Sequence, residues 1–336
     1  MRFDFTEEQY ALRDGAREFL AGECTTTHLR QTWESADGVD AGRWKQLAET
    51  GMLGAMVPEE FDGLGLDEVD VVLLLEEAGY AALPEPLTET AAVAVPALIE
   101  AGTAEQQHQW LPRIASGDAV ATIALGGDTL VPAGHVADLV VLEHDGLLHA
   151  VPSERFTATQ ELTVDHGRRV ATVMADVSDA TAMPGGPETV MAAADRAAAA
   201  TAAFLNGVSR RLLDMTVDYV KERHQFGRPV GSFQAIKHKL AETHLAVETA
   251  LPAGWYAAYA IAHDLPDRSL AASVAKAYAS DAAAKADRES LQCHGGIGFT
   301  WEHDLHLWLK RSNALQRTHG TAADHRRRIA DELFAG

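Results

Sequence analysis

The sequence has very little cysteine, no long apolar run and no apolar leader at its N-terminus. Its 336 residues include two cysteines, Cys24 and Cys293, which lie far apart and fit neither a metal-binding cluster nor a disulfide framework. No segment approaches the roughly 18–20 apolar residues that span a bilayer, and the first residues do not resemble a secretory signal. These absences predict a cytoplasmic protein that does not associate with membranes.

Basic residues are also scarce relative to acidic ones. The chain has 28 Lys and Arg against 49 Asp and Glu, which gives a formal net charge of -21. Nucleic acids are bound by cationic faces, so we do not expect one as a partner. An acidic surface of this kind can simply keep a protein in solution, and it is compatible with a local basic pocket for a phosphorylated cofactor.

The first part of the chain carries helical signals. Thr6 and Gln9 have the spacing of a capping box. Apolar residues then recur at helical spacing over residues 44–50, 67–81 and 88–101. These patterns predict an N-terminal helical domain over residues 1–116.

The pattern changes at Gly117. Short runs rich in Val, Leu and Thr predict strands at 120–125, 139–142, 147–151 and 169–175. A Pro-Gly-Gly-Pro hinge at 184–187 follows, and the remaining chain is rich in alanine with long helical patterns, which suits a bundle of closely packed helices. We therefore expect a mainly α fold with a reduced middle β domain at 117–186 and a C-terminal four-helix bundle at 187–336.

Three sets of motifs, in matching order, resemble the acyl-CoA dehydrogenase family and together extend over nearly the whole chain. They are Phe5–Gln9 with Gly51–Gly54, Val57–Glu60 and Gly63–Leu66; Glu222–Gly227 with Phe233–Ile236; and Gln292–Thr300. The resemblance implies the fold of that family, FAD as the cofactor, an acyl-CoA substrate, and an electron-transfer flavoprotein or similar acceptor.

In this family the C-terminal motifs hold the ADP half of a flavin whose ring is seated mainly by a neighbouring subunit. The planar guanidinium of Arg223 would match pyrophosphate oxygens, and Gln234 would be an uncharged donor and acceptor. Gly227 would allow a turn, and the glycines of 292–298 would let backbone amides approach a nucleotide. The resemblance implies these cofactor contacts: Arg223, Gln225, Phe226, Gln234, Gln292, Gly295, Gly296 and Thr321.

Two parts of the family's active site are missing. The loop that seats the flavin ring, usually Thr-Glu-Pro followed by Gly-Ser-Asp, has no counterpart after residues 121–128. The carboxylate that removes the α-proton is also absent, because His319 occupies the usual Glu position. A second placement used by some members falls near Ala197, and Asp195 would reach it only after a rotation of about 200° on the helix.

Intact cofactor motifs without a base predict a partner subunit. We hypothesise an α2β2 heterotetramer in which a homologous catalytic subunit supplies the Glu and the ring seat. Residues 294–307 resemble the two-gene enzymes of actinobacterial steroid side-chain oxidation, which implies a steroid-CoA substrate. Two alternatives stay open: a self-sufficient homotetramer or flavin monooxygenase relative with His319 as base, and a flavin-free scaffold that is not catalytic.

Two further clusters have simpler interpretations. His303, Asp304 and His306 do not place three ligands on one helical face, so no metal is expected and the segment 301–308 is assigned to helix capping and interface packing. The basic run at 326–328 is interpreted as a solvated helix face.

Overall fold

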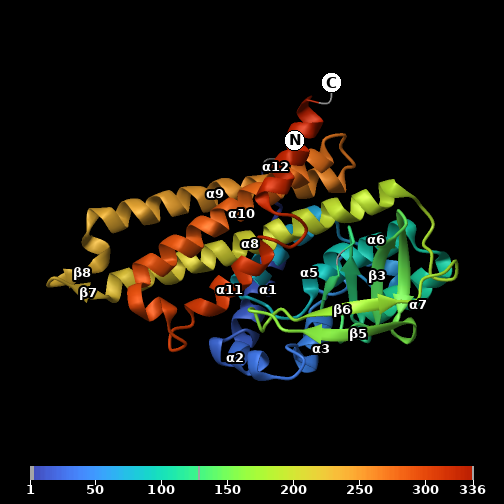
Figure 1. Ribbon diagram of the computed structural model, residues 1–336, viewed down its shortest axis with the longest axis horizontal. Coiled ribbons are helices and arrows are strands. Elements are labelled where there is room, and N and C mark those ends of the chain that lie inside the picture. Colours follow the sequence, from blue (N-terminus) through green and yellow to red (C-terminus); the bar gives the residue numbers. More distant parts are fainter. Residues whose placement is uncertain (1–3, 128, 335–336) are drawn as a thin grey trace.

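The computed structural model describes residues 4–127 and 129–334. The part before residue 116 is built from helices, as the sequence predicts, and it lies on one side of the long C-terminal helices (Figure 1). These elements are α1 (Glu7–Glu23), α2 (Thr26–Glu34), α3 (Ala41–Glu49), the 3-10 turn η1 (Glu59–Phe61), α4 (Glu68–Tyr80), α5 (Leu87–Glu89), the π-helical turn η2 (Thr90–Ala94), α6 (Val95–Ala101) and α7 (Ala104–Ala115).

Capping boxes fix where several of these helices begin. The Gln9 amide donates to Thr6 Oγ1 at 3.2 Å while the Thr6 amide donates to Gln9 Oε1 at 2.8 Å, which confirms the box expected there. Asp67 and Thr103 begin α4 and α7 in the same way. Each box satisfies backbone N–H groups that a helix start leaves without partners.

The middle of the chain forms two small sheets. The sheet β1-β3-β4 pairs β1 with β3 in parallel and β3 with β4 antiparallel, and the sheet β2-β6-β5 is antiparallel throughout. The strands are β1 (Ala121–Ala124), β2 (Leu130–Pro132), β3 (Leu139–His144), β4 (Leu147–Pro152), β5 (Phe156–Glu161) and β6 (Val170–Ala175), with a 3-10 turn η3 (Ser153–Arg155).

The sequence patterns predict four of these six strands and miss β2 and β5. β2 is only three residues long and ends in a proline, so it carries almost no pattern. In β5, Thr157 and Thr159 face solvent while Phe156 and Ala158 face the small core under this sheet. That alternation is a usable strand signal, although its apolar members are few.

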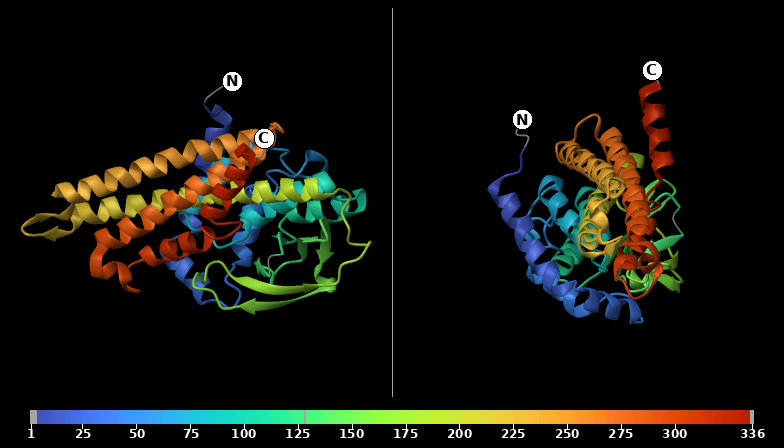
Figure 2. Two further views of the ribbon diagram at one scale, coloured as in Figure 1. Left: turned by 45° about the horizontal axis from the view of Figure 1, so that its top comes forward. Right: turned by 90° about the vertical axis from the view of Figure 1, so that its left-hand side faces the viewer.

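Three long helices form most of the rest of the molecule. α8 (Pro187–Glu222), α9 (Gln234–Ala262) and α10 (Arg268–His294) run side by side, and their common end projects beyond the sheets (Figures 1 and 2). The remaining elements are β7 (His224–Gln225), β8 (Arg228–Pro229), η4 (Val230–Ser232), η5 (Gly295–Phe299), α11 (Leu305–Leu315) and α12 (Ala322–Phe334).

Small residues allow these helices to approach one another closely. Half of the buried residues of α10 are alanines, as are many of those of α8. Where α4 crosses α8, a Cβ on Gly79 would lie 1.9 Å from the Phe204 carbonyl oxygen, and a Cβ on Gly207 would lie equally close to that of Glu76. Both glycines are therefore required for this crossing. Within the described residues, no helix has the combination of length and apolar content that crossing a bilayer demands.

Candidate functional site

The projecting end of the bundle gathers the cofactor motifs. It consists of the end of α8, the β7–β8 hairpin, the start of α9 and the end of α10, and we call it the tip. Tyr219 stacks on His294 with ring centroids 4.3 Å apart, which joins α8 to α10. Lys239 pairs with Glu289 at 2.5 Å, which joins α9 to α10. The three helix ends are thus held in one arrangement.

Seven of the eight expected cofactor contacts lie at the tip, and all seven are exposed. The guanidinium of Arg223 makes no ion pair or side-chain hydrogen bond with the part of the chain that the structure describes. Phe226 has 92% of its surface exposed and a left-handed φ of 52°. These polar and aromatic groups therefore face outward, away from the chain's own core.

The glycines of the tip leave open space beside the backbone. Gly227 and Gly295 have φ values of 75° and 63°, which favour glycine at both turns. A Cβ built on Gly227, Gly295 or Gly296 would meet no atom of the chain within 4 Å. Packing within the chain does not explain these glycines, whereas close approach of an external group would.

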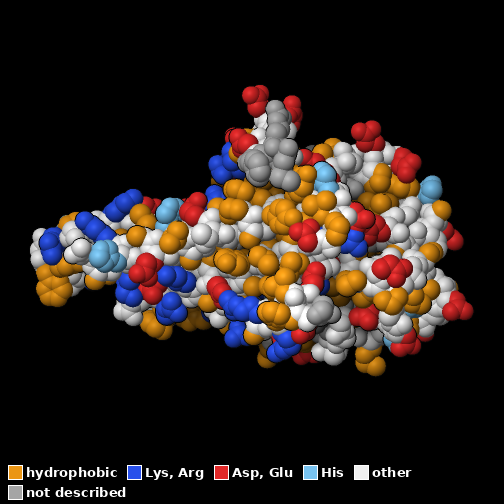
Figure 3. Space-filling view, turned by 90° about the horizontal axis from the view of Figure 1, so that it is seen from above, with side chains coloured by type: hydrophobic (Ala, Val, Ile, Leu, Met, Phe, Trp, Pro, Cys, Tyr) orange, Lys and Arg blue, Asp and Glu red, His pale blue; other side chains and the backbone are white. Residues whose placement is uncertain are grey.

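The tip is also basic in an otherwise acidic protein. Between residues 221 and 239 there are five Lys or Arg residues and one Glu. Figure 3 shows blue side chains gathered toward the narrow end, while the charged side chains at the broad end are mostly red. A concentration of cations on an exposed surface favours a ligand with phosphate groups.

Thr321 is the predicted cofactor contact that lies elsewhere. Its hydroxyl donates to Asp324 at 2.7 Å and begins α12. The neighbouring Gly320 carbonyl accepts a hydrogen bond from Lys276 Nζ at 2.8 Å. Because α10 rises about 1.5 Å per residue, the tip at Gly295 is about 28 Å along the helix from Lys276. The sequence could not separate these two locations.

His319, in the turn before Gly320, has the properties of a poor base. Burial, followed by the positive charges of Arg168 and Lys276, lowers the pKa of His319 to about 3. The ring is neutral at physiological pH, but so acidic a conjugate acid makes the imidazole a weak proton acceptor. The residue also has a left-handed φ of 54°.

Asp195, near the second base position, is held in a structural network. Its carboxylate is 1% exposed and accepts hydrogen bonds from Ser269 and, at 2.8 Å, from Arg328 Nη2. The interpretation of residues 326–328 as a solvated face is therefore wrong for Arg328, which reaches across 133 positions to a buried carboxylate. Neither base position of this chain presents a free carboxylate.

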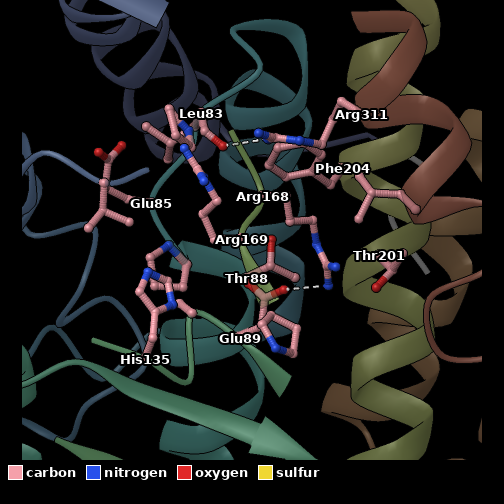
Figure 4. A pocket seen from close by; sticks show the side chains of 16 residues that line it. Leu83, Glu85, Thr88, Glu89, His135, Arg168, Arg169, Thr201, Phe204 and Arg311 are labelled. Atoms are coloured by element: carbon pink, nitrogen blue, oxygen red, sulfur yellow. Dashed lines mark hydrogen bonds and ion pairs between the residues drawn. The ribbon is translucent and has the colours of Figure 1, made fainter. Parts of the chain in front are cut away.

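A narrow cavity lies between α5, α8, α11 and the β2 and β6 ends (Figure 4). Its free space is about 30 Å³, and since one water needs about 10–15 Å³, it has room for about two or three waters. Arg168 donates to Glu89 Oε1 across it at 3.0 Å. Arg311 at its edge donates to the Leu83 carbonyl at 2.6 Å. No local sequence pattern indicates these residues, because the paired groups lie far apart in the chain.

The second half of the cluster at 301–308 is buried in the chain's own fold, whereas Trp301 is 62% exposed. Asp304 pairs with Arg30 at 2.7 Å, and the His306 ring packs against both Trp33 and Trp301, with centroids 5.4 and 4.7 Å away. The amide at the start of α11 donates to the His303 ring, so this histidine performs the capping expected in the segment.

Comparison with known proteins gives consistent matches. Residues 6–118 match the family profile described as acyl-CoA dehydrogenase, N-terminal domain, and residues 185–334 match acyl-CoA dehydrogenase, C-terminal domain. The chain is 33% identical over 335 residues to acyl-CoA dehydrogenase IpdE2 of Mycolicibacterium smegmatis, covering 98% of this chain and 100% of the relative.

Two solved structures are similar over almost the whole chain. One is the Tcur3481-Tcur3483 steroid ACAD, with a TM-score of 0.91, 29% identity and 98% coverage of both chains. The other is the ChsE4-ChsE5 complex from Mycobacterium tuberculosis, with a TM-score of 0.92, 26% identity and 99% coverage of both.

Proposed function

The chain belongs to the acyl-CoA dehydrogenase family, the FAD-dependent oxidoreductases that act on CH–CH groups. On that premise we propose that it is the subunit of a heteromeric member that lacks the catalytic base. In this assembly a homologous partner subunit supplies the carboxylate base and the flavin-ring seat. This chain supplies cofactor contacts across the interface between them. The enzyme introduces an α,β double bond into an acyl-CoA thioester.

The observation that carries this proposal is the contrast between cofactor motifs and base positions. Seven of the eight expected cofactor contacts are exposed at the tip. Of the two base positions, one holds the weakly basic His319 and the other lies beside Asp195, which is already paired with Arg328. General-base catalysis needs a group of matched pKa next to the α-carbon, so a second chain has to provide it.

The residues of the tip fit the ADP half of FAD. Arg223 would hold the pyrophosphate, Gln234 and Gln292 would bind polar edges, and the open backbone at Gly295 and Gly296 would allow the close approach that a phosphate requires. When bound, FAD supplies the acceptor for the hydride that leaves the β-carbon. The part of this chain is to bind and orient the cofactor, with electrons passing on to an electron-transfer flavoprotein or similar acceptor.

The similar structures support both a partner and a substrate class. The solved neighbours carry paired names, one described as a steroid ACAD and the other as a two-component complex. A partner of the same family and a CoA thioester with a bulky steroid-derived acyl group are therefore the assignments we propose for this chain. A heterotetramer of two copies of each subunit is the arrangement we propose.

Co-expression tests the proposal. The chain should bind little or no flavin when it is expressed alone, and it should co-purify with a homologous, Glu-bearing partner as a yellow complex with a single flavin per pair of chains. The measurement is the ratio of flavin absorbance to protein after gel filtration. Stoichiometric flavin on the isolated chain would instead favour the self-sufficient alternative with His319, and absence of flavin in every pairing would favour the scaffold.

A further inference from the structure

A hollow in the surface lies where α1 and the start of α2 meet α4, α8 and α11. None of the residues that line it belongs to the tip or to the turn that carries His319. Its floor is apolar, since Leu20, Cys24 and Trp308 line it and all three are buried. Its free volume of about 190 Å³ is below the roughly 300–1,000 Å³ of pockets that take drug-sized ligands, so it has room for a small molecule.

Arg211 is a charged group of this hollow that has no counter-charge. Its guanidinium carbon lies 5.2 Å from the centre of the Trp308 ring and 5.3 Å from that of the Tyr80 ring, so two aromatic side chains hold it in place. Its one hydrogen bond to the described residues is to the Tyr80 hydroxyl, at 3.5 Å, and it makes no ion pair with them. The nearby Asp214 is exposed and accepts instead from the Tyr80 hydroxyl, at 3.0 Å. Most of the five N–H donors of this guanidinium therefore remain free for a ligand.

The other charged groups beside the hollow are paired with one another. Glu77, which is 2% exposed, pairs with Arg17 at 2.8 Å and with Arg210 at 3.4 Å. The neighbouring Glu76 is buried as well, and burial raises its pKa to about 8, so it is mostly protonated at neutral pH. Among the described residues, these two carboxyls therefore provide one full negative charge for three guanidinium groups. A bound anion would offset this excess of positive charge.

We propose that the hollow binds a small carboxylate with a compact apolar body, such as an aromatic acid. The carboxylate pairs with Arg211, because the planar fork of a guanidinium matches two carboxylate oxygens. The apolar body lies on the floor formed by Leu20, Cys24 and Trp308. An apolar floor disfavours a free inorganic anion, which would lose hydration there without gaining apolar contacts. This site is separate from the cofactor site of the proposed function and does not depend on it.

The first test is a calorimetric titration of the co-purified complex with benzoate. One benzoate should bind per copy of this chain. Benzamide has the same shape without the charge, and inorganic phosphate has charge without the apolar body, so each should bind at least about tenfold more weakly. If benzoate releases no heat of binding at millimolar concentration, or binds no more tightly than benzamide, the proposal is wrong. Phosphate that binds as tightly as benzoate would overturn the role of the apolar floor.

The second test removes the guanidinium. Arg211→Gln should weaken benzoate binding about tenfold or more, because a charge-assisted hydrogen bond is lost. Arg113→Gln is the matched control: Arg113 is also partly buried, its guanidinium carbon is 4.8 Å from the centre of the Trp110 ring, and it makes no ion pair with the described residues. The control should bind benzoate like the wild type. Equal affinity in the wild type and in Arg211→Gln would overturn the assignment to Arg211.

Thermal unfolding provides a separate measurement. A ligand that binds only the folded state raises the melting temperature, so benzoate should do this for the wild type and for Arg113→Gln but not for Arg211→Gln. If Arg211→Gln does not fold, the comparison of benzoate with benzamide on the wild type still decides. A different occupant, a carboxylate of the partner subunit, would leave benzoate without effect and make Arg211→Gln weaken co-purification of the two chains. That result would overturn the proposal of a small ligand.

Discussion

The tip and the turn that carries His319 meet α10 at points about 28 Å apart, at Gly295 and at Lys276, whose ammonium donates to the Gly320 carbonyl. The charged side chains at the two places are arranged in opposite ways. At the tip, cationic and amide side chains are exposed, and Arg223 has no partner among the described residues. Near the His319 end, Arg311 is buried, Arg168 is only 13% exposed, and each is paired with a carboxylate.

The difference teaches how a site can be kept or lost within one fold. A buried charge has to be paired within the chain, because desolvation is costly, and such pairing leaves nothing free for a ligand. An exposed charge is solvated by water, so it can remain unpaired until a phosphate group binds. The charged groups of the tip are therefore available to a ligand outside the chain, whereas those near His319 are already satisfied by partners within the chain.

The largest effect is expected when the tip loses its guanidinium. Arg223→Ala in the co-purified complex should weaken flavin binding about tenfold to a hundredfold, because a charge-assisted hydrogen bond contributes about 1.5–3 kcal/mol. Flavin retention during dialysis, read by fluorescence of the released cofactor, measures the loss. Arg327→Ala is the matched control, since Arg327 is an exposed arginine away from the tip whose one ion-pair partner among the described residues is the nearby Asp324. Equal flavin loss in both variants would remove the contrast between the two ends.

Local sequence patterns made the helices and the tip predictable. The capping box at Thr6, the helical spacing, the hinge and the cofactor motifs are all short-range signals, and the exposed glycine turns follow from them. The fold class and the family were therefore within reach of the sequence.

The buried ion pairs near the His319 end depend on contacts between distant parts of the chain, which no local sequence pattern contains. Arg168 and Glu89 are 79 positions apart, and Arg311 and Asp165 are 146 apart. A charged residue reads as exposed until its buried partner is known. For the same reason the distance between Thr321 and the tip could not be predicted from the sequence.

A smaller effect is expected on the pH dependence of the free energy of unfolding, which should be sensitive to a lysine near His319 and insensitive to one at the tip. Lys276 is fully buried beneath the His319 turn and donates to the Gln316 and Gly320 carbonyls. Burial lowers the pKa of Lys276 from 10.5 to about 8. Between these values the unfolded chain binds a proton that the folded chain does not, so stability rises with pH by up to about 3 kcal/mol. Below about pH 8 both states are protonated and the contribution becomes constant.

Lys276→Met should abolish that rise. Equilibrium urea denaturation of the complex from pH 7 to pH 10 should show the wild type gaining stability relative to the variant as the pH increases. Lys237→Met, which removes an exposed lysine at the tip, controls for the loss of a lysine itself and should follow the wild type. A wild-type advantage that does not change with pH would mean that Lys276 is not the group responsible.

The smallest effect is expected at the position where the family has its base. His319→Asn keeps a residue that tolerates the left-handed φ of 54°, and it should change turnover of the complex by less than about twofold with flavin content unchanged. The reason is that an imidazole with a pKa of about 3 contributes almost no basicity at neutral pH. A loss of turnover of a hundredfold or more with flavin retained would identify His319 as the base. In that case the His319 end would be an active site, and the contrast with the tip would have to be abandoned.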